Sequence, residues 1–102
     1  MPTYVLMTRL SPELMQDPRG RKAVGRQWQR RMDRACPEVK WLAHYALLGP
    51  YDCMDIYEAP SNDVAYKVSL ISRACGAASA ESWPATPYER YLELVAEIEQ
   101  KR

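Results

Sequence analysis

Apolar and polar residues repeat along this chain with two different periods, which predict a mixture of strands and helices. Four short segments are rich in β-branched, aromatic or aliphatic residues, or alternate in polarity as strands do: residues 3–10, 39–48, 51–58 and 78–83. The dipeptide Gly49-Pro50 predicts a tight turn between the second and third of these segments. We therefore expect the second and third strands to form a hairpin.

Three other segments place apolar residues at every third or fourth position, which predicts helices with one buried face. The first runs from Asp17 and Pro18 to Cys36, because Asp can cap a helix and Pro at its first position loses no needed donor. The second lies between a Ser61 cap and Gly76, and the third begins at about residue 88. The predicted buried faces are Val24, Trp28, Met32 and Ala35, then Val64, Val68, Ile71 and Cys75, then Tyr91, Leu92, Val95 and Ile98.

The elements follow one another in the order β-α-β-β-α-β-α. The first six match the split β-α-β arrangement of a ferredoxin-like fold, and a C-terminal helix follows them. This α+β fold has one four-stranded antiparallel sheet with two helices on one face and the other face open. A chain of 102 residues with no visible repeat or linker predicts a single domain over residues 1–102.

Composition narrows the range of partners. Hydrophobic residues make up 47% of the chain and charged residues 26%, as in ordinary globular proteins. No apolar run approaches the length of a membrane span, so we expect no membrane partner. The first residues show no basic stretch followed by an apolar one, and we expect a cytoplasmic protein without a signal peptide.

The first predicted helix is strongly basic, although the net charge of the chain is only +1. Asp33 is the one acidic residue among its cations, which are Arg19, Arg21, Lys22, Arg26, Arg30, Arg31 and Arg34. Such a surface could contact nucleic acid. We favour a solvated outer face and expect no nucleic-acid partner, because Trp28 is the only aromatic residue among the cations and its period assigns it to the core. An acidic stripe on the last helix could complement this face: Glu89, Glu93 and Glu97.

The chain has three cysteines, Cys36, Cys53 and Cys75, and one histidine, His44. An odd number of cysteines without a Cys-x-x-Cys pair is a poor framework for disulfides or for zinc. The spacing of these four residues matches no metal-binding pattern. We therefore expect free thiols, no metal site and no cofactor.

Three stretches of the sequence together resemble the GYD-domain family: MPTYVLMTRL, CPEVKWLAHYALLGPYDCMDIYEAPSNDVAYKVS and ESWPATPYER. The most specific part is a combination of Gly49, Tyr51 and Asp52 with Glu58-Ala59-Pro60. The resemblance implies a dimeric α/β barrel, in which ferredoxin-like protomers pair through their open sheet faces. It implies no catalytic residue.

Alternation within the hairpin sorts its side chains onto two faces. With a loop of two or four residues, one face carries His44, Cys53, Asp55 and Tyr57, and the other carries Trp41, Ala43, Tyr45, Leu47, Met54 and Ile56. The second set is apolar, so we expect it beneath the helices and the polar set on the open face. A three-residue loop or a bulge would instead place Asp55 under the helices, where an unpartnered carboxylate is costly. Apolar residues expected on the open face favour a homodimer: Leu42, Ala46 and Leu48.

The sequence predicts a small-molecule-binding protein whose ligand site comprises His44, Cys53, Asp55 and Tyr57. A few polar groups among apolar walls are the usual composition of such a site. A second hypothesis is a cofactor-independent isomerase or monooxygenase-like enzyme, with His44 as base and Asp55 or Tyr57 orienting it. A structural or regulatory interaction module is a third. Cys53 could also act as a nucleophile with His44 as its base, although a thiol more often acts as a small apolar group.

Overall fold

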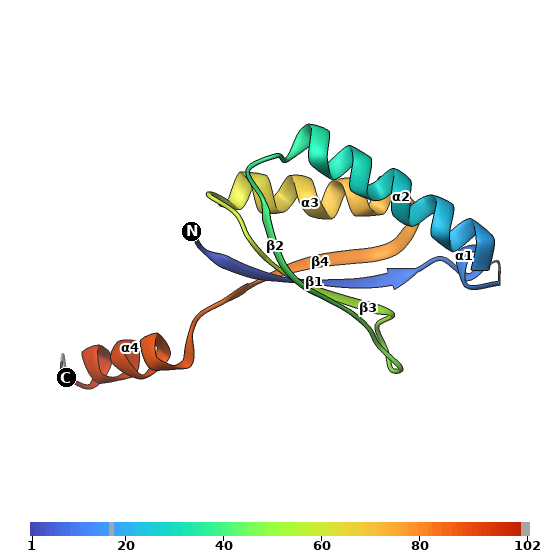
Figure 1. The fold of residues 1–102 in the computed structure, drawn as a ribbon. Coiled ribbons are helices and arrows are strands. Elements are labelled where there is room, and N and C mark those ends of the chain that lie inside the picture. The colour runs from blue at the N-terminus through green and yellow to red at the C-terminus, as the bar shows by residue number, and fades with distance from the viewer. Residues whose placement is uncertain (17, 101–102) are drawn as a thin grey trace.

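The protein has one four-stranded antiparallel sheet with two long helices on one of its faces (Figure 1). The structure is a computed structural model that describes residues 1–16 and 18–100. The elements are β1 (Thr3–Leu10), α1 (Pro12–Gln16), α2 (Pro18–Ala35), β2 (Lys40–Ala46), β3 (Cys53–Glu58), α3 (Asn62–Ala74), β4 (Ala77–Ala85) and α4 (Tyr88–Gln100). The strands lie in the order β2-β3-β1-β4. The predicted ferredoxin-like α+β fold is thus confirmed, with the short helix α1 added after β1.

The strands differ from the predicted segments at their ends. β2 and β3 are shorter than predicted because residues 47–52 form the turn, in which the Leu47 N–H donates to the Asp52 carbonyl over 2.9 Å. β4 is longer than predicted and continues through Pro84. An edge strand tolerates a proline, since one side of it forms no ladder and needs no N–H donor there.

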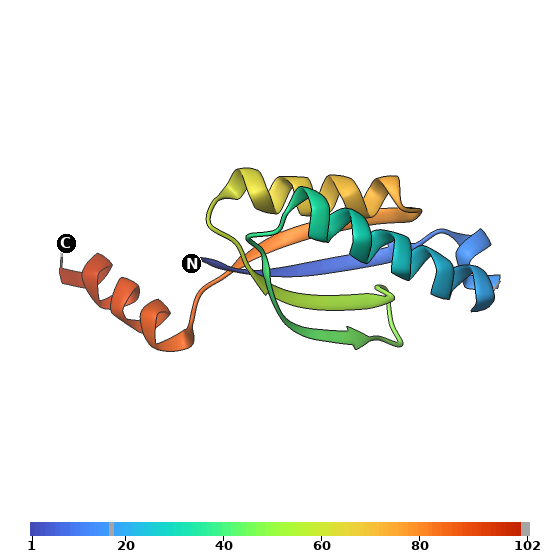
Figure 2. The same cartoon turned by 45° about the horizontal axis from the view of Figure 1, so that its top comes forward.

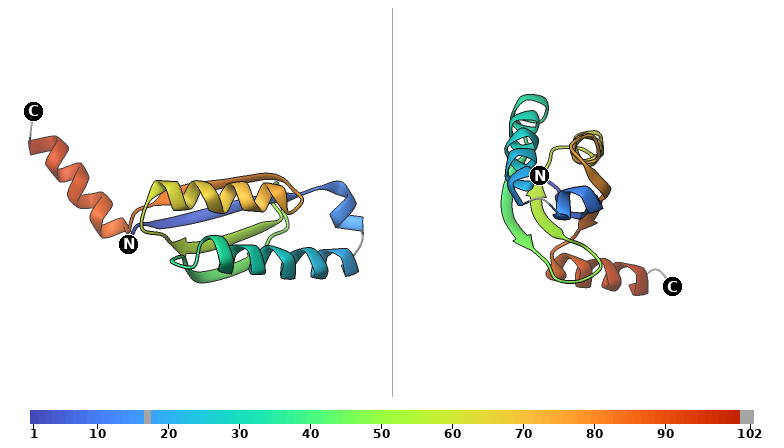
Figure 3. Two further views of the ribbon diagram at one scale, coloured as in Figure 1. Left: turned by 90° about the horizontal axis from the view of Figure 1, so that it is seen from above. Right: turned by 90° about the vertical axis from the view of Figure 1, so that its right-hand side faces the viewer.

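The two long helices lie over different halves of the sheet, with α3 above β1 and β4 and α2 above β2 and β3 (Figures 2 and 3). Their buried side chains meet the strands in one core, which includes Leu6, Met32, Tyr57, Val64 and Val68. Each fully buried aliphatic side chain of this kind contributes roughly 1.5–3 kcal/mol. The predicted inner faces of α2 and α3 are confirmed, except that Cys36 rather than Ala35 is buried after α2.

The ends of α3 form as predicted. The Val64 N–H donates to the Ser61 Oγ over 3.4 Å and so caps the first turn. Gly76 follows the helix with φ of 104°, a conformation that residues with a Cβ rarely adopt. A Cβ at this position would also lie 2.8 Å from the Leu14 Cδ1. Asp17, which was predicted to cap α2, lies outside the described residues.

The hairpin turns its polar set toward the helices, opposite to the prediction, and a bulge in β2 brings Trp41 to the same side. His44 pairs with Asp55, but the register shifts between Trp41 and Ala43 and leaves Leu42 as an extra residue. Asp55 also pairs with Leu6 of β1, whose side chain lies in the core beneath the helices. The polar set His44, Cys53, Asp55 and Tyr57 therefore lies on the helix-covered face. The prediction of an open-face site is wrong, because Asp55 has a partner and so can be buried.

The face without helices, called the open face here, is apolar in its middle and carries charged residues toward its margins. The apolar residues are Val5, Met7, Ala43, Tyr45, Met54, Ile56 and Trp83, and the charged ones are Arg9, Lys40, Glu58 and Glu81. Tyr45 and Trp83 are exposed. Of the apolar residues predicted for this face, Ala46 pairs with Cys53 on the other side, and Leu48 lies in the turn. The hairpin thus presents most of its apolar set, and not the predicted polar set, on the open face.

The C-terminal helix α4 extends away from the sheet and its two covering helices (Figure 1). None of its residues is buried, and its predicted inner side is largely exposed at Tyr91, Leu92 and Ile98. Its acidic stripe does not meet α2; Glu93 and Glu97 instead pair with Arg90 on the same helix, over 2.8 and 3.7 Å. A single helix of this length is marginal in water, so α4 lacks the partner that its apolar side needs. No helix in the described part of the chain has the length and apolar character of a membrane span.

Candidate ligand site between α2 and the sheet

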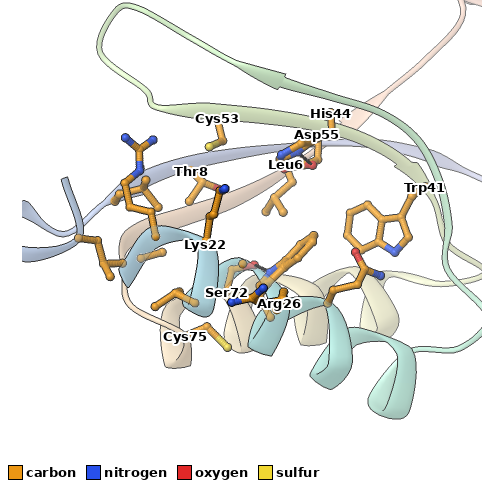
Figure 4. A pocket seen from close by; sticks show the side chains of 18 of the residues that line it. Leu6, Thr8, Lys22, Arg26, Trp41, His44, Cys53, Asp55, Ser72 and Cys75 are labelled. Carbon is orange, nitrogen blue, oxygen red and sulfur yellow. Dashed lines mark hydrogen bonds and ion pairs between the residues drawn. The ribbon is translucent and has the colours of Figure 1, made fainter. Parts of the chain in front are cut away.

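A cavity of about 820 Å³ lies between α2 and the helix-covered face of the sheet (Figure 4). Its floor comes from β1, β2 and β3, and one wall comes from α2. Leu14 of α1, Cys75 after α3 and Ala77 of β4 also line it. The volume is that of a pocket for a small organic molecule.

Two neighbouring positions of α2 explain why this space is not filled. The Trp28 indole packs against Trp41 with ring centroids 5.0 Å apart, and its Nε1–H donates to the Ser72 Oγ over 2.9 Å. These contacts fix a large side chain between the helix and the sheet. One turn earlier stands Gly25, where an added Cβ would find no atom within 4 Å. The large Trp28 side chain and the lack of a side chain at Gly25 together leave the space open.

The floor of the cavity contains a buried carboxyl group with a histidine partner. Asp55 is 4% exposed, and its Oδ1 pairs with the Nδ1 of His44 on the neighbouring strand (Figure 4). Burial raises the pKa of Asp55, while the hydrogen bond and the charge of His44 oppose this shift. The His44 side chain remains 69% exposed. The pair therefore links a buried acid to an accessible imidazole, an arrangement that can hold or transfer a proton.

Cys53 and Tyr57 contribute less than predicted. Cys53 lines the cavity, but burial raises its pKa, and the carboxylates of Asp55 and Asp52 raise it further. A thiol held in the protonated form is a weak nucleophile, so the nucleophile hypothesis loses its support. Tyr57 does not line the cavity. It is fully buried, donates to the Ser82 Oγ over 2.7 Å, and has its pKa raised by burial to about 12.

Three cations of α2 line the cavity, and we call them the cationic wall: Arg21, Lys22 and Arg26. Within the described residues they form no ion pair and no hydrogen bond. The positive charge of Arg21 acts on Cys53 in the floor of the cavity. It lowers the pKa of Cys53, although burial raises this pKa by more. Figure 4 shows the Lys22 side chain running from α2 toward the strands.

The cations of α2 are exposed to solvent, as predicted, but they divide into two groups by position. Arg30 and Arg34 do not line the cavity, whereas the three residues of the cationic wall do. The helical period contains a signal for this division: Gly25 and Arg21 continue the inward row of Met32 and Trp28, one turn and two turns before Trp28. Residue type alone does not separate the two groups, because cations in a helix are usually solvated.

Three residues of the family motif, Gly49, Tyr51 and Asp52, lie in the turn and outside the cavity. The Asp52 Oδ2 accepts from the Leu10 N–H over 2.8 Å and so ties the hairpin to the end of β1. The Tyr51 ring meets Trp83 edge to face, with centroids 5.8 Å apart, and its hydroxyl donates to Glu81 over 3.2 Å. The side-chain partner of Asp52 thus comes from β1 and not from the turn itself.

Metal binding finds no support in the part of the chain that the structure describes. There, no three or more His, Cys, Asp or Glu side chains gather where they could hold an ion. The described cysteines, Cys36, Cys53 and Cys75, are free thiols.

These features define the class of the protein as a ferredoxin-like α+β domain with a cavity under one helix and an open sheet face. The chain belongs to the GYD domain family, whose family model matches residues 4–95. The match spans the four strands and both long helices, and it ends within α4. Searches of curated proteins and of solved structures gave no match.

Replacing Asp55 by Asn should raise the free energy of unfolding at pH 7, by roughly 0.5–2 kcal/mol. Folding raises the pKa of the carboxyl above its ordinary 3.8. Above that pH the folded state therefore binds more protons than the unfolded state, and stability falls as the pH rises through the folded pKa. Asn keeps the shape and an acceptor for His44 without the charge. The gain should disappear near pH 3, where the carboxyl is protonated in both states.

Urea unfolding of both proteins between pH 3 and pH 8 measures this difference. The matched control is Asp33→Asn, which removes an exposed carboxylate from α2 and should change stability little at any pH. A clear loss of stability in the Asp55 variant at pH 7 would mean that the carboxylate is there to stabilise the fold. That result would contradict its assignment to a binding site.

Proposed function

We propose that the protein binds a small organic molecule in the cavity between α2 and the sheet. One observation carries this proposal: a buried carboxyl group, paired with His44, opens into a cavity whose other walls are mostly apolar. A core that served folding alone would be more stable with a neutral, well-packed residue at this position. A few polar groups on apolar walls are the usual composition of a ligand site.

The geometry of the pair supports a second candidate function, which is acid–base catalysis without a cofactor. Because Nδ1 of His44 pairs with Asp55, Nε2 is the nitrogen left to exchange a proton with a bound molecule. An isomerase would use it to move a proton between two carbon atoms, and a monooxygenase-like enzyme would use it to ionise its substrate. In both cases Asp55 orients the imidazole and stabilises its protonated form.

Replacing Gly25 by Leu should abolish binding in the cavity without lowering the stability of the protein. The new side chain would extend into space that is now empty. A glycine within a helix also costs about 1 kcal/mol relative to a good helix former, so the folded state should gain stability. The measurement is a thermal-shift screen of small organic compounds against both proteins.

Compounds that raise the melting temperature of the wild-type protein should leave that of Gly25→Leu unchanged. Ala23→Leu is the matched control, because Ala23 is exposed on the same helix and does not line the cavity. It should respond like the wild type. Compounds that stabilise the wild type and Gly25→Leu equally would bind elsewhere, and that result would contradict the proposed site.

We also propose that two copies of the chain associate through their open faces. That face carries an exposed aromatic side chain on each edge strand, Tyr45 on β2 at 54% and Trp83 on β4 at 42%, with the apolar residues of β1 and β3 between them. Large apolar patches of this kind are rare on monomers. The unpartnered apolar side of α4 points to the same conclusion, since a second copy would supply the contact that this chain does not. Dimerisation also adds buried surface to a small domain.

Sedimentation equilibrium at micromolar concentration should report twice the chain mass for the wild type. The double variant Tyr45→Glu, Trp83→Glu should report the mass of one chain, because it places charges in the proposed interface. Tyr66→Glu alters an exposed tyrosine on α3 and should remain dimeric. A monomeric wild type, or a double variant as dimeric as the control, would contradict this association.

A further inference from the structure

The charges around the cavity indicate which class of molecule it accepts, and this step rests on the proposed function. We infer that the cavity binds a flat aromatic anion. The ring of the ligand packs near Trp28 and Trp41, and its anionic group contacts the cationic wall.

The first argument is the imbalance of charge. The lining contains three cations, Arg21, Lys22 and Arg26, but a single carboxylate, Asp55. That carboxylate already has a partner in His44, and the three cations have no ion-pair partner among the described residues. An anionic group of a ligand could pair with these cations, because no carboxylate in the described part of the chain already does so. The space is partly enclosed, and electrostatic interactions there are stronger than in water. A cationic ligand would be repelled.

The second argument is the order of the lining residues along α2. The cations come first, between residues 21 and 26, and Trp28 follows. At 1.5 Å per residue, the rise from Arg21 to Trp28 is about 10 Å, which is the length of a two-ring organic molecule. The cavity is therefore cationic toward the start of α2 and aromatic toward its middle. A molecule with a charged end and a ring end matches this polarity.

The third argument is the rigidity of the aromatic end. The Trp28 indole is held on two sides, by its contact with Trp41 and by its hydrogen bond to the buried Ser72. Ser72 in turn donates to the Val68 carbonyl over 2.8 Å, which fixes its hydroxyl. A ring surface held in this way favours flat ligands, because little side-chain freedom remains to be lost on binding.

Two fluorescent probes test this inference: 8-anilinonaphthalene-1-sulfonate and N-phenyl-1-naphthylamine, which has the same rings without the sulfonate. We expect the wild type to bind the sulfonate at least tenfold more tightly than the neutral probe. The variant Lys22→Gln, Arg26→Gln should lose most of this preference and keep its affinity for the neutral probe. The control Arg30→Gln, Arg34→Gln removes the same charge from the outer side of α2 and should keep the preference.

The outcomes separate the ligand class from the proposed function. Equal affinities of the wild type for both probes, or equal losses in the two double variants, would overturn the assignment to anions. The proposed function would still hold in that case if Gly25→Leu prevents both probes from binding. If neither probe binds the wild type, or if Gly25→Leu changes nothing, the cavity is not their site and both proposals fail.

Discussion

The buried carboxyl group of Asp55 is the constraint that the rest of the helix-covered face accommodates. A carboxyl group in the central part of the sheet, beneath the helices, needs a partner, because an isolated buried charge would cost several kcal/mol. The bulge at Leu42 allows Trp41 and His44 to lie on the same side of β2, so that one strand supplies both the aromatic packing and the partner of the acid. The cavity then keeps the pair accessible from outside.

The same region shows how the domain trades stability for an accessible site. Gly25 weakens the middle of α2, and burial works against the charged form of Asp55. Both features lie on the walls of one cavity. Away from the cavity the helix-covered face is a packed apolar core that includes Met32, Tyr57, Val64 and Val68. Deviations from optimal packing that collect at one place are the pattern expected of a functional site.

The periods of the sequence predicted the strands, the long helices, the inner faces of α2 and α3 and the shared face of His44 and Asp55, because these depend on local spacing. They did not predict which face of the sheet the pair occupies. One extra residue at Leu42 changes the side on which Trp41 lies, and sorting by polarity assumed that no carboxylate would be buried. The cavity depends on the distance between α2 and the sheet, and no local pattern of residues predicts that distance. The apolar side of α4 was predicted correctly, but this chain does not cover it.

The most direct test of a ligand cavity beneath α2 is a crystal structure of the protein grown with 8-anilinonaphthalene-1-sulfonate. The structure should contain the probe between α2 and β3, with its sulfonate near Lys22 and Arg26 and its rings toward Trp28. A probe bound only on the open face, or an α2 that packs onto the sheet and leaves no cavity, would contradict it.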